Sequence, residues 1–219
     1  MAMRISVALA TLLVSGFVAL PAFGQPAGSQ ASAALGARLK EVEGNPRQMA
    51  AMYKTGAKVA AFCANCHGEG GNSLKPDIPN LAGQNPAYLL EQMRQFSEGE
   101  RRNEFMQRLI KVLSPDEKVG MVVFYAQQEV IHKPATNAAL ASQGQQYYSK
   151  TCWRCHGEQG RGNESFARIA GQQAPYLSLA LKRYRDGSSV RQDPLMSSNT
   201  RLMSNADIAA VVAYVSSMK

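Results

Sequence analysis

The sequence predicts an all-α protein built from two tandem domains of similar structure. Landmark residues recur along the 219-residue chain at an offset of about 89 residues. Apolar residues recur at helical spacing, with little sign of strands. A polar, proline-containing break at His132–Asn137 separates the two repeats. We therefore expect a first domain over residues 45–131, a linker over 132–139 and a second domain over 140–219.

The first 24 residues have the pattern of a secretory signal peptide. Arg4 is their only charged residue, an apolar run covers residues 5–20, and the small residues Ala22 and Gly24 suit signal peptidase. The run is slightly short for a membrane-spanning helix, so cleavage after Gly24 is favoured over a retained anchor. Residues 25–44 begin with a stretch rich in small polar residues and are predicted to be a flexible leader. We expect the mature protein in the periplasm.

Two Cys-x-x-Cys-His runs contain all four cysteines of the chain. This pattern is the attachment signature of c-type haem. Two thiols three positions apart reach the two vinyl groups on one porphyrin edge, and the adjacent histidine is then the proximal iron ligand. A covalently bound apolar cofactor would also complete the core of a domain this small. The sequence thus predicts two covalent haem c groups, with thioethers at Cys63, Cys66, Cys152 and Cys155 and proximal ligands at His67 and His156.

Three other interpretations of the cysteines fit the sequence less well than haem attachment. A zinc site would need the two pairs to converge from different repeats, and it would leave the following histidines unexplained. A Cys-x-x-Cys disulfide closes a very small ring and is usually redox-active rather than structural. A thioredoxin-like site would need a strand before the motif, and none is visible.

The repeats carry matching helix signals. We expect first helices over residues 47–64 and 140–153, each leading into a haem motif. Leu81-Ala82-Gly83-Gln84 matches Ile169-Ala170-Gly171-Gln172 in the second repeat. The expected middle helices begin at Pro86 and Pro175 and end at Gly99 and Gly187. The expected last helices begin after Ser114 and Ser204 and carry an aromatic residue near their ends, Tyr125 and Tyr214.

These motifs resemble those of the c4-type di-haem cytochromes, within the class of small bacterial cytochromes c, over about residues 45–219. The resemblance implies two cytochrome c-like domains, in each of which the first helix crosses the last with a glycine at the contact. Gly144 matches the implied spacing, whereas Gly56 is about one residue off it. The resemblance also implies that the proximal histidines donate to the backbone carbonyls of Pro79 and Ala167.

The same resemblance puts a methionine, the sixth iron ligand, in the loop between the middle and last helices. Met106 occupies that loop in the first domain. In the second, Met196 is preferred and Met203 is a rival. Two other methionines, Met93 and Met121, fall inside expected helices and are interpreted as core residues. The remaining histidine, His132, is interpreted as a solvated linker residue.

If a histidine and a methionine fill both axial positions of the iron, no position is open to a substrate. This ligation indicates an electron carrier rather than an enzyme. The resemblance implies a shuttle between a quinol-oxidising complex or dehydrogenase and a terminal oxidase or reductase. The formal charge of +8 suits acidic docking surfaces on such partners. An exported haem protein is not expected to bind nucleic acid, and a peripheral membrane association remains open. The alternatives are a di-haem subunit of a flavoprotein dehydrogenase and a haem enzyme, such as a peroxidase, with one open iron.

Overall fold

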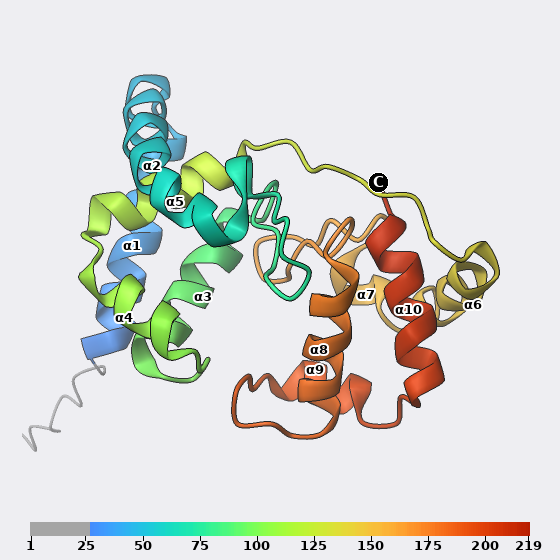
Figure 1. The fold of residues 1–219 in the computed structure, drawn as a ribbon. Coiled ribbons are helices and arrows are strands. Elements are labelled where there is room, and N and C mark those ends of the chain that lie inside the picture. Colours follow the sequence, from blue (N-terminus) through green and yellow to red (C-terminus); the bar gives the residue numbers. More distant parts are fainter. Residues whose placement is uncertain (1–26) are drawn as a thin grey trace, which may run out of the picture.

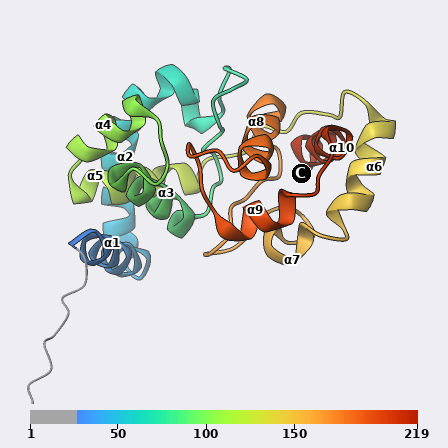
Figure 2. The same ribbon diagram turned by 90° about the horizontal axis from the view of Figure 1, so that it is seen from below.

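The computed structural model describes residues 27–219, and its regular elements are all helices, which confirms the all-α prediction. Figures 1 and 2 show two helical bodies side by side, joined by one extended linker. The predicted signal peptide lies outside the described residues. The first body contains α1 (Ala27–Glu43), α2 (Pro46–His67), the 3-10 helix η1 (Glu69–Gly71), α3 (Pro86–Glu98), α4 (Glu104–Val112) and α5 (Pro115–Ala126). The second contains α6 (Ala138–Tyr148), α7 (Trp153–His156), α8 (Ala174–Arg185), α9 (Pro194–Thr200) and α10 (Asn205–Ser217).

Helix α1 corrects the expectation of a flexible leader over residues 25–44. From residue 27 onward that stretch is helical, and its second half packs against α2, α3 and α5. Leu39 and Val42 are buried in the core of the first body, and Arg38 pairs with Asp116 of α5 at 3.5 Å. The error came from composition, because the many small residues hid an apolar stripe at helical spacing. The first structural unit therefore begins before residue 45.

Both bodies are built around a close crossing of their first and last long helices. A Cβ atom added to Gly56 of α2 would lie 1.9 Å from the carbonyl oxygen of Gly120 in α5. A Cβ on Gly144 of α6 would lie 1.9 Å from the carbonyl oxygen of Ala210 in α10. Glycine is therefore required at both crossings, as the family resemblance implies, and Gly56 takes this place despite its offset.

A break between two helices of the second body explains why Gly56 is one residue off the spacing that Gly144 matches. Helix α2 runs without interruption into the first motif and ends at His67, whereas the helix expected over residues 140–153 stops at Tyr148. A turn follows, and α7 begins only at Trp153. The second repeat has one more residue between its crossing glycine and its first cysteine, and this turn accommodates it.

The residues that the sequence predicts at helix ends have the expected roles in the structure. Pro86 opens α3, and the Ser114 and Ser204 side chains each form a capping box at the start of the last helix. Gly99 takes the left-handed conformation after α3, with φ 81°. Between residues 27 and 219 no helix is long and apolar enough to span a membrane.

Candidate haem sites

The first attachment motif lies on the last turn of α2. Cys63 and Cys66 are half-buried free thiols, and His67 is buried. The Cys63 Sγ lies 3.7 Å from the sulfur of Met121, and burial raises the pKa of this thiol. The motif therefore faces the apolar interior of the first domain, where an apolar ring system would be sheltered from water.

The second motif spans the turn before α7 and α7 itself. Cys152 and Cys155 are also half-buried free thiols, and burial raises the pKa of Cys152 to about 11. No disulfide joins any of the four cysteines. The part of the chain that the structure describes also holds no cluster of three or more His, Cys, Asp or Glu side chains able to bind a metal. Neither a zinc site nor a disulfide pair is formed by these residues.

The two motif histidines are oriented by the same contact. Nδ1 of His67 lies 2.9 Å from the carbonyl oxygen of Pro79, and Nδ1 of His156 lies 2.9 Å from that of Ala167. Both predicted partners are thereby confirmed. A carbonyl only accepts, so Nδ1 carries the proton and Nε2 is left as the metal-binding nitrogen. Burial lowers the pKa of both histidines, which favours the neutral ring that iron requires.

The two methionines predicted as sixth ligands occupy equivalent places. Met106 is the third residue of α4 and Met196 the third residue of α9, so both lie in short helices rather than in loops. Each backbone N–H donates to the side chain of the capping residue, Asn103 at 3.0 Å and Asp193 at 2.9 Å. Both side chains are half-buried.

The rival methionine belongs to the core. Met203 is 5% exposed and packs with the apolar side chains of α10. It directly precedes the capping Ser204, as Leu113 precedes Ser114 in the first repeat, and Leu113 also packs on its domain's core. Met93 and Met121 are buried core residues, as expected.

His132 differs from expectation. Its Nδ1 lies 2.7 Å from the carbonyl oxygen of Met218, and the side chain is half-buried rather than solvated. The linker crosses the end of α10, which brings this ring against Gly171. His132 is therefore part of the packing between the linker and the second domain.

A cluster of cations between the two domains fits the carboxylates of haem. The guanidinium groups of Arg101 and Arg191 both contact the Tyr176 hydroxyl, at 3.0 and 2.6 Å, and Arg191 also contacts the Tyr88 hydroxyl. No carboxylate between residues 27 and 219 forms an ion pair with either arginine. Burial acts to raise the pKa of Tyr176, but the two arginines outweigh it and lower that pKa. Such a positive site suits anionic propionates, so the residues present fit the cofactor.

Comparisons with known proteins agree with this geometry. The family model described as cytochrome c matches residues 141–219. Cytochrome c4 of Pseudomonas aeruginosa is 32% identical over 172 residues, which cover 73% of this chain and 85% of the relative. The chain belongs to the cytochrome c4 family.

Two further relatives extend the comparison. A reduced recombinant cytochrome c4 from Pseudomonas stutzeri has a TM-score of 0.70 at 28% identity, covering 76% of this chain and 98% of that one. A protein named thiosulfate dehydrogenase electron acceptor, from Thiomonas intermedia, is 32% identical over 71% of this chain and 78% of its own length. Cytochromes c4 carry two covalently bound haem c groups, and this chain has one attachment motif for each. It is a di-haem electron-transfer cytochrome.

Sequence reasoning missed the polar groups that connect the two domains. The repeat pattern gives Gln84 and Gln172 only as matching positions, and it assigns no role to Tyr88 and Tyr176. A signal was available, because both copies keep a glutamine and a tyrosine at matching positions although buried polar residues need a partner. Each of the four has a partner in the opposite domain, which one repeat alone could not identify.

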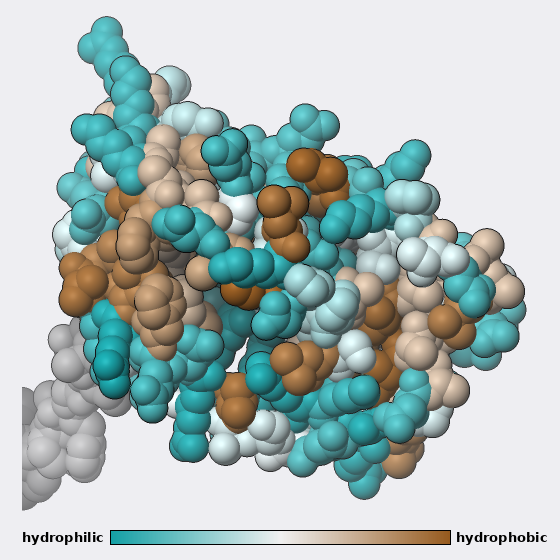
Figure 3. Space-filling view, in the orientation of Figure 1, coloured by the Kyte–Doolittle hydropathy of each residue, from teal (hydrophilic) through white to brown (hydrophobic). Residues whose placement is uncertain are grey.

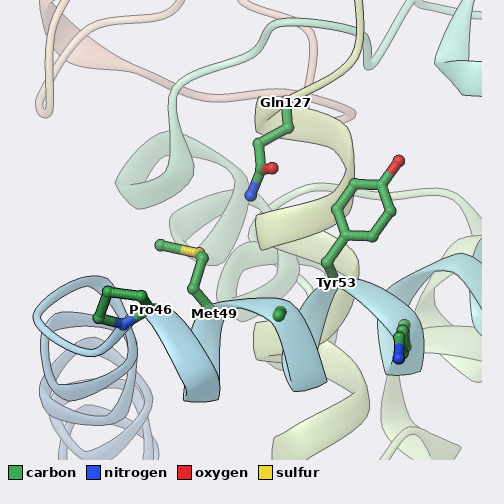
Figure 4. Close-up of a pocket in the computed structure, with 6 residues that line it drawn as sticks. Pro46, Met49, Tyr53 and Gln127 are labelled. Atoms are coloured by element: carbon green, nitrogen blue, oxygen red, sulfur yellow. The ribbon is translucent and has the colours of Figure 1, made fainter.

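One groove lies away from both motifs. It has a volume of about 410 Å³ and contains no motif cysteine or histidine. Figure 4 shows Met49 and Tyr53 rising from α2 toward Gln127 at the end of α5. The lining residues are Pro46, Met49, Ala50, Tyr53, Lys54 and Gln127. Nothing in the groove's position connects it with electron transfer.

Proposed function

We propose that this chain is a periplasmic carrier that shuttles single electrons between respiratory redox proteins. The donor would be a quinol-oxidising complex or a dehydrogenase, and the acceptor a terminal oxidase or reductase. One observation carries the proposal: each domain pairs a carbonyl-held histidine with a methionine at the third position of a short capped helix. With these two side chains as its axial ligands, a bound haem would exchange single electrons and would offer no open position to a substrate.

The ligand assignment follows from the repeated geometry. We assign the thioethers to Cys63, Cys66, Cys152 and Cys155, the proximal ligands to His67 and His156, and the sixth ligands to Met106 and Met196. The internal match between α4 and α9 supports Met196, whereas the buried position of Met203 supports a packing role.

The protein's own residues would position and shield the two haems. The histidines are held by backbone carbonyls, and the apolar clusters of both domains exclude water from the motifs. Arg101 and Arg191 would neutralise propionates at the boundary between the domains. Backbone contacts fix that boundary: the N–H of Arg102 donates to Val190 at 2.8 Å, and that of Tyr176 to Pro76 at 3.1 Å. A fixed boundary supports electron transfer within the protein.

The outer surface supports association with acidic partners. Figure 3 shows apolar side chains over the region of α4, where Phe105 and Val112 are 57% and 78% exposed. Arg102 and Lys111 are exposed beside them. An apolar spot with a basic rim favours a partner that carries carboxylates around its own contact, and the association should weaken with salt.

The export pattern of residues 1–24 supports a periplasmic location. The relative named as an electron acceptor of thiosulfate dehydrogenase favours a specific second candidate, in which the donor is a sulfur-compound dehydrogenase rather than a quinol-oxidising complex. Mixing the oxidised protein with each purified donor and following haem reduction separates the two. A stable, co-purifying flavin subunit would instead support the alternative that the chain is the di-haem subunit of a flavoprotein dehydrogenase.

Three matched variants test the ligand assignment and test whether each iron lacks an open coordination position. Met106→Ala and Met196→Ala should each remove one haem's sulfur-to-iron charge-transfer band and let that haem bind carbon monoxide when reduced. Met203→Ala is the control, and it should lower stability while keeping both bands. Loss of a band in the Met203 variant but not in the Met196 variant would reverse the assignment. Carbon monoxide binding by the unaltered protein would support a haem enzyme with an open iron.

A further inference from the structure

Two glutamines join the domains through a reciprocal pair of contacts. Gln84 and Gln172 hold matching positions in the two repeats and are only 6% and 8% exposed. Oε1 of Gln84 accepts the backbone N–H of Arg168 at 2.7 Å, and its Nε2 donates to the carbonyl of the same residue at 2.9 Å. Oε1 of Gln172 accepts the N–H of Asn80 at 2.7 Å, and its Nε2 donates to that residue's carbonyl at 3.0 Å. Each glutamine side chain therefore forms two hydrogen bonds with the backbone of one residue in the opposite domain.

The N–H groups that donate to these glutamines belong to the peptide groups that orient the proximal histidines. The N–H of Asn80 belongs to the same peptide group as the carbonyl of Pro79, which accepts from His67. The N–H of Arg168 likewise shares a peptide group with the carbonyl of Ala167, which accepts from His156. A chain of two hydrogen bonds thus runs from a glutamine of one domain, through one peptide group, to the histidine of the other domain.

Such a chain changes the strength of the terminal hydrogen bond. An acceptor on the N–H side polarises the peptide group and makes its carbonyl a stronger acceptor. A stronger acceptor at Nδ1 makes the imidazole a better electron donor at Nε2, which stabilises ferric iron. By this reasoning, each glutamine would lower the reduction potential of the haem bound in the opposite domain.

We propose that Gln84 and Gln172 are positioning residues that set, across the domain boundary, the reduction potential of the opposite haem. Gln172 acts on the first haem through the Pro79–Asn80 peptide, and Gln84 acts on the second through the Ala167–Arg168 peptide. This inference rests on the proposed function, because it requires His67 and His156 as iron ligands. It goes beyond that function by coupling each domain's ligand to a side chain of its neighbour.

Gln172→Leu and Gln84→Leu in the full-length di-haem protein test the proposal. Redox titration followed by haem methyl NMR signals resolves the two potentials. Gln172→Leu should shift the first haem's equilibrium about three- to tenfold toward the reduced form, where tenfold equals 59 mV for one electron. The second haem should change less. Gln84→Leu should give the mirror result, and the Nδ1–H signal of the affected histidine should move upfield in the reduced protein.

A third glutamine is the matched control. Gln173 is 8% exposed and also crosses the boundary, but its amide donates to the Ser73 carbonyl and the Asn80 side chain, not to either histidine-holding peptide. Gln173→Leu should leave both potentials nearly unchanged. Equal shifts of both haems, no shift, or an equal effect of Gln173→Leu would overturn the proposal.

A second variant and a spectrum keep the test decisive. If Gln172→Leu does not fold, Gln172→Asn is measured, because its side chain is one methylene too short to hold the peptide. The charge-transfer band is recorded for every variant. Its absence in the unaltered protein would refute the ligand assignment, whereas intact bands with unshifted potentials would refute only the role of the glutamines.

Discussion

Replacing Gly144 with alanine should strongly destabilise the second domain. The new Cβ would lie 1.9 Å from the carbonyl oxygen of Ala210 and 2.9 Å from the Cβ of Tyr214, where real contacts begin at about 3.0 Å. Helices α6 and α10 would therefore have to separate by about 1 Å. Overpacking costs about 1–3 kcal/mol, and a clash with backbone belongs at the top of that range. The better helix propensity of alanine offsets about 1 kcal/mol, so we expect a net loss of about 2 kcal/mol.

Urea unfolding of the haem-loaded protein, followed by circular dichroism, measures this loss. Gly36→Ala is the matched control, since Gly36 also lies inside a helix but a Cβ there meets nothing within 4 Å. The control should gain up to about 1 kcal/mol in free energy of unfolding. A Gly144→Ala protein as stable as the unaltered one would refute the reasoning about the helix crossing.

Three further predictions follow from single contacts. Leu39→Ala should cost about 2–4 kcal/mol in urea unfolding, because α1 is part of the first core; a cost below about 0.5 kcal/mol would mean that α1 is detachable. Tyr148→Phe removes the 2.6 Å hydrogen bond to the Gly157 carbonyl, which still accepts from the Gly160 N–H at 3.1 Å, and should cost about 1 kcal/mol. Tyr53→Phe, whose hydroxyl makes one 3.3 Å contact, should cost less. The Ser114 backbone N–H lowers the pKa of Glu117, so the stabilisation from this carboxylate is present above the ordinary glutamate pKa and is lost as pH falls through the lowered one. Melting temperatures should thus favour the unaltered protein over Glu117→Gln at neutral pH and converge in acid; a difference independent of pH would contradict this.

Much of the fold could be predicted because its signals are local. The Cys-x-x-Cys-His runs, the proline at Pro86 and the capping serines act within one helical turn, so each can be interpreted without knowing the rest of the molecule. The histidine partners at Pro79 and Ala167 came from the family resemblance, and the structure confirms them.

The errors arose where a local pattern was weak or ambiguous. The buried side chains of α1, Leu39 and Val42, stand among small residues whose composition suggests a linker. The break between Tyr148 and Trp153 accommodates a single extra residue, which periodicity alone does not locate.

Contacts between the domains could not be predicted at all. The peptide groups that Gln84 and Gln172 hold lie in the opposite repeat, far away in the sequence. The contacts of Arg101 with Tyr176 and of Arg191 with Tyr88 depend in the same way on how the domains dock. No helical or motif pattern within one repeat encodes that arrangement.

The most direct test of the central claim is an absorption spectrum of the oxidised, haem-loaded protein, combined with haem quantification. The account predicts two haems per chain, sulfur-to-iron charge-transfer intensity for both, and no carbon monoxide binding on reduction. One haem that lacks the band and binds carbon monoxide would contradict the closed-carrier account and indicate catalysis or sensing at that iron.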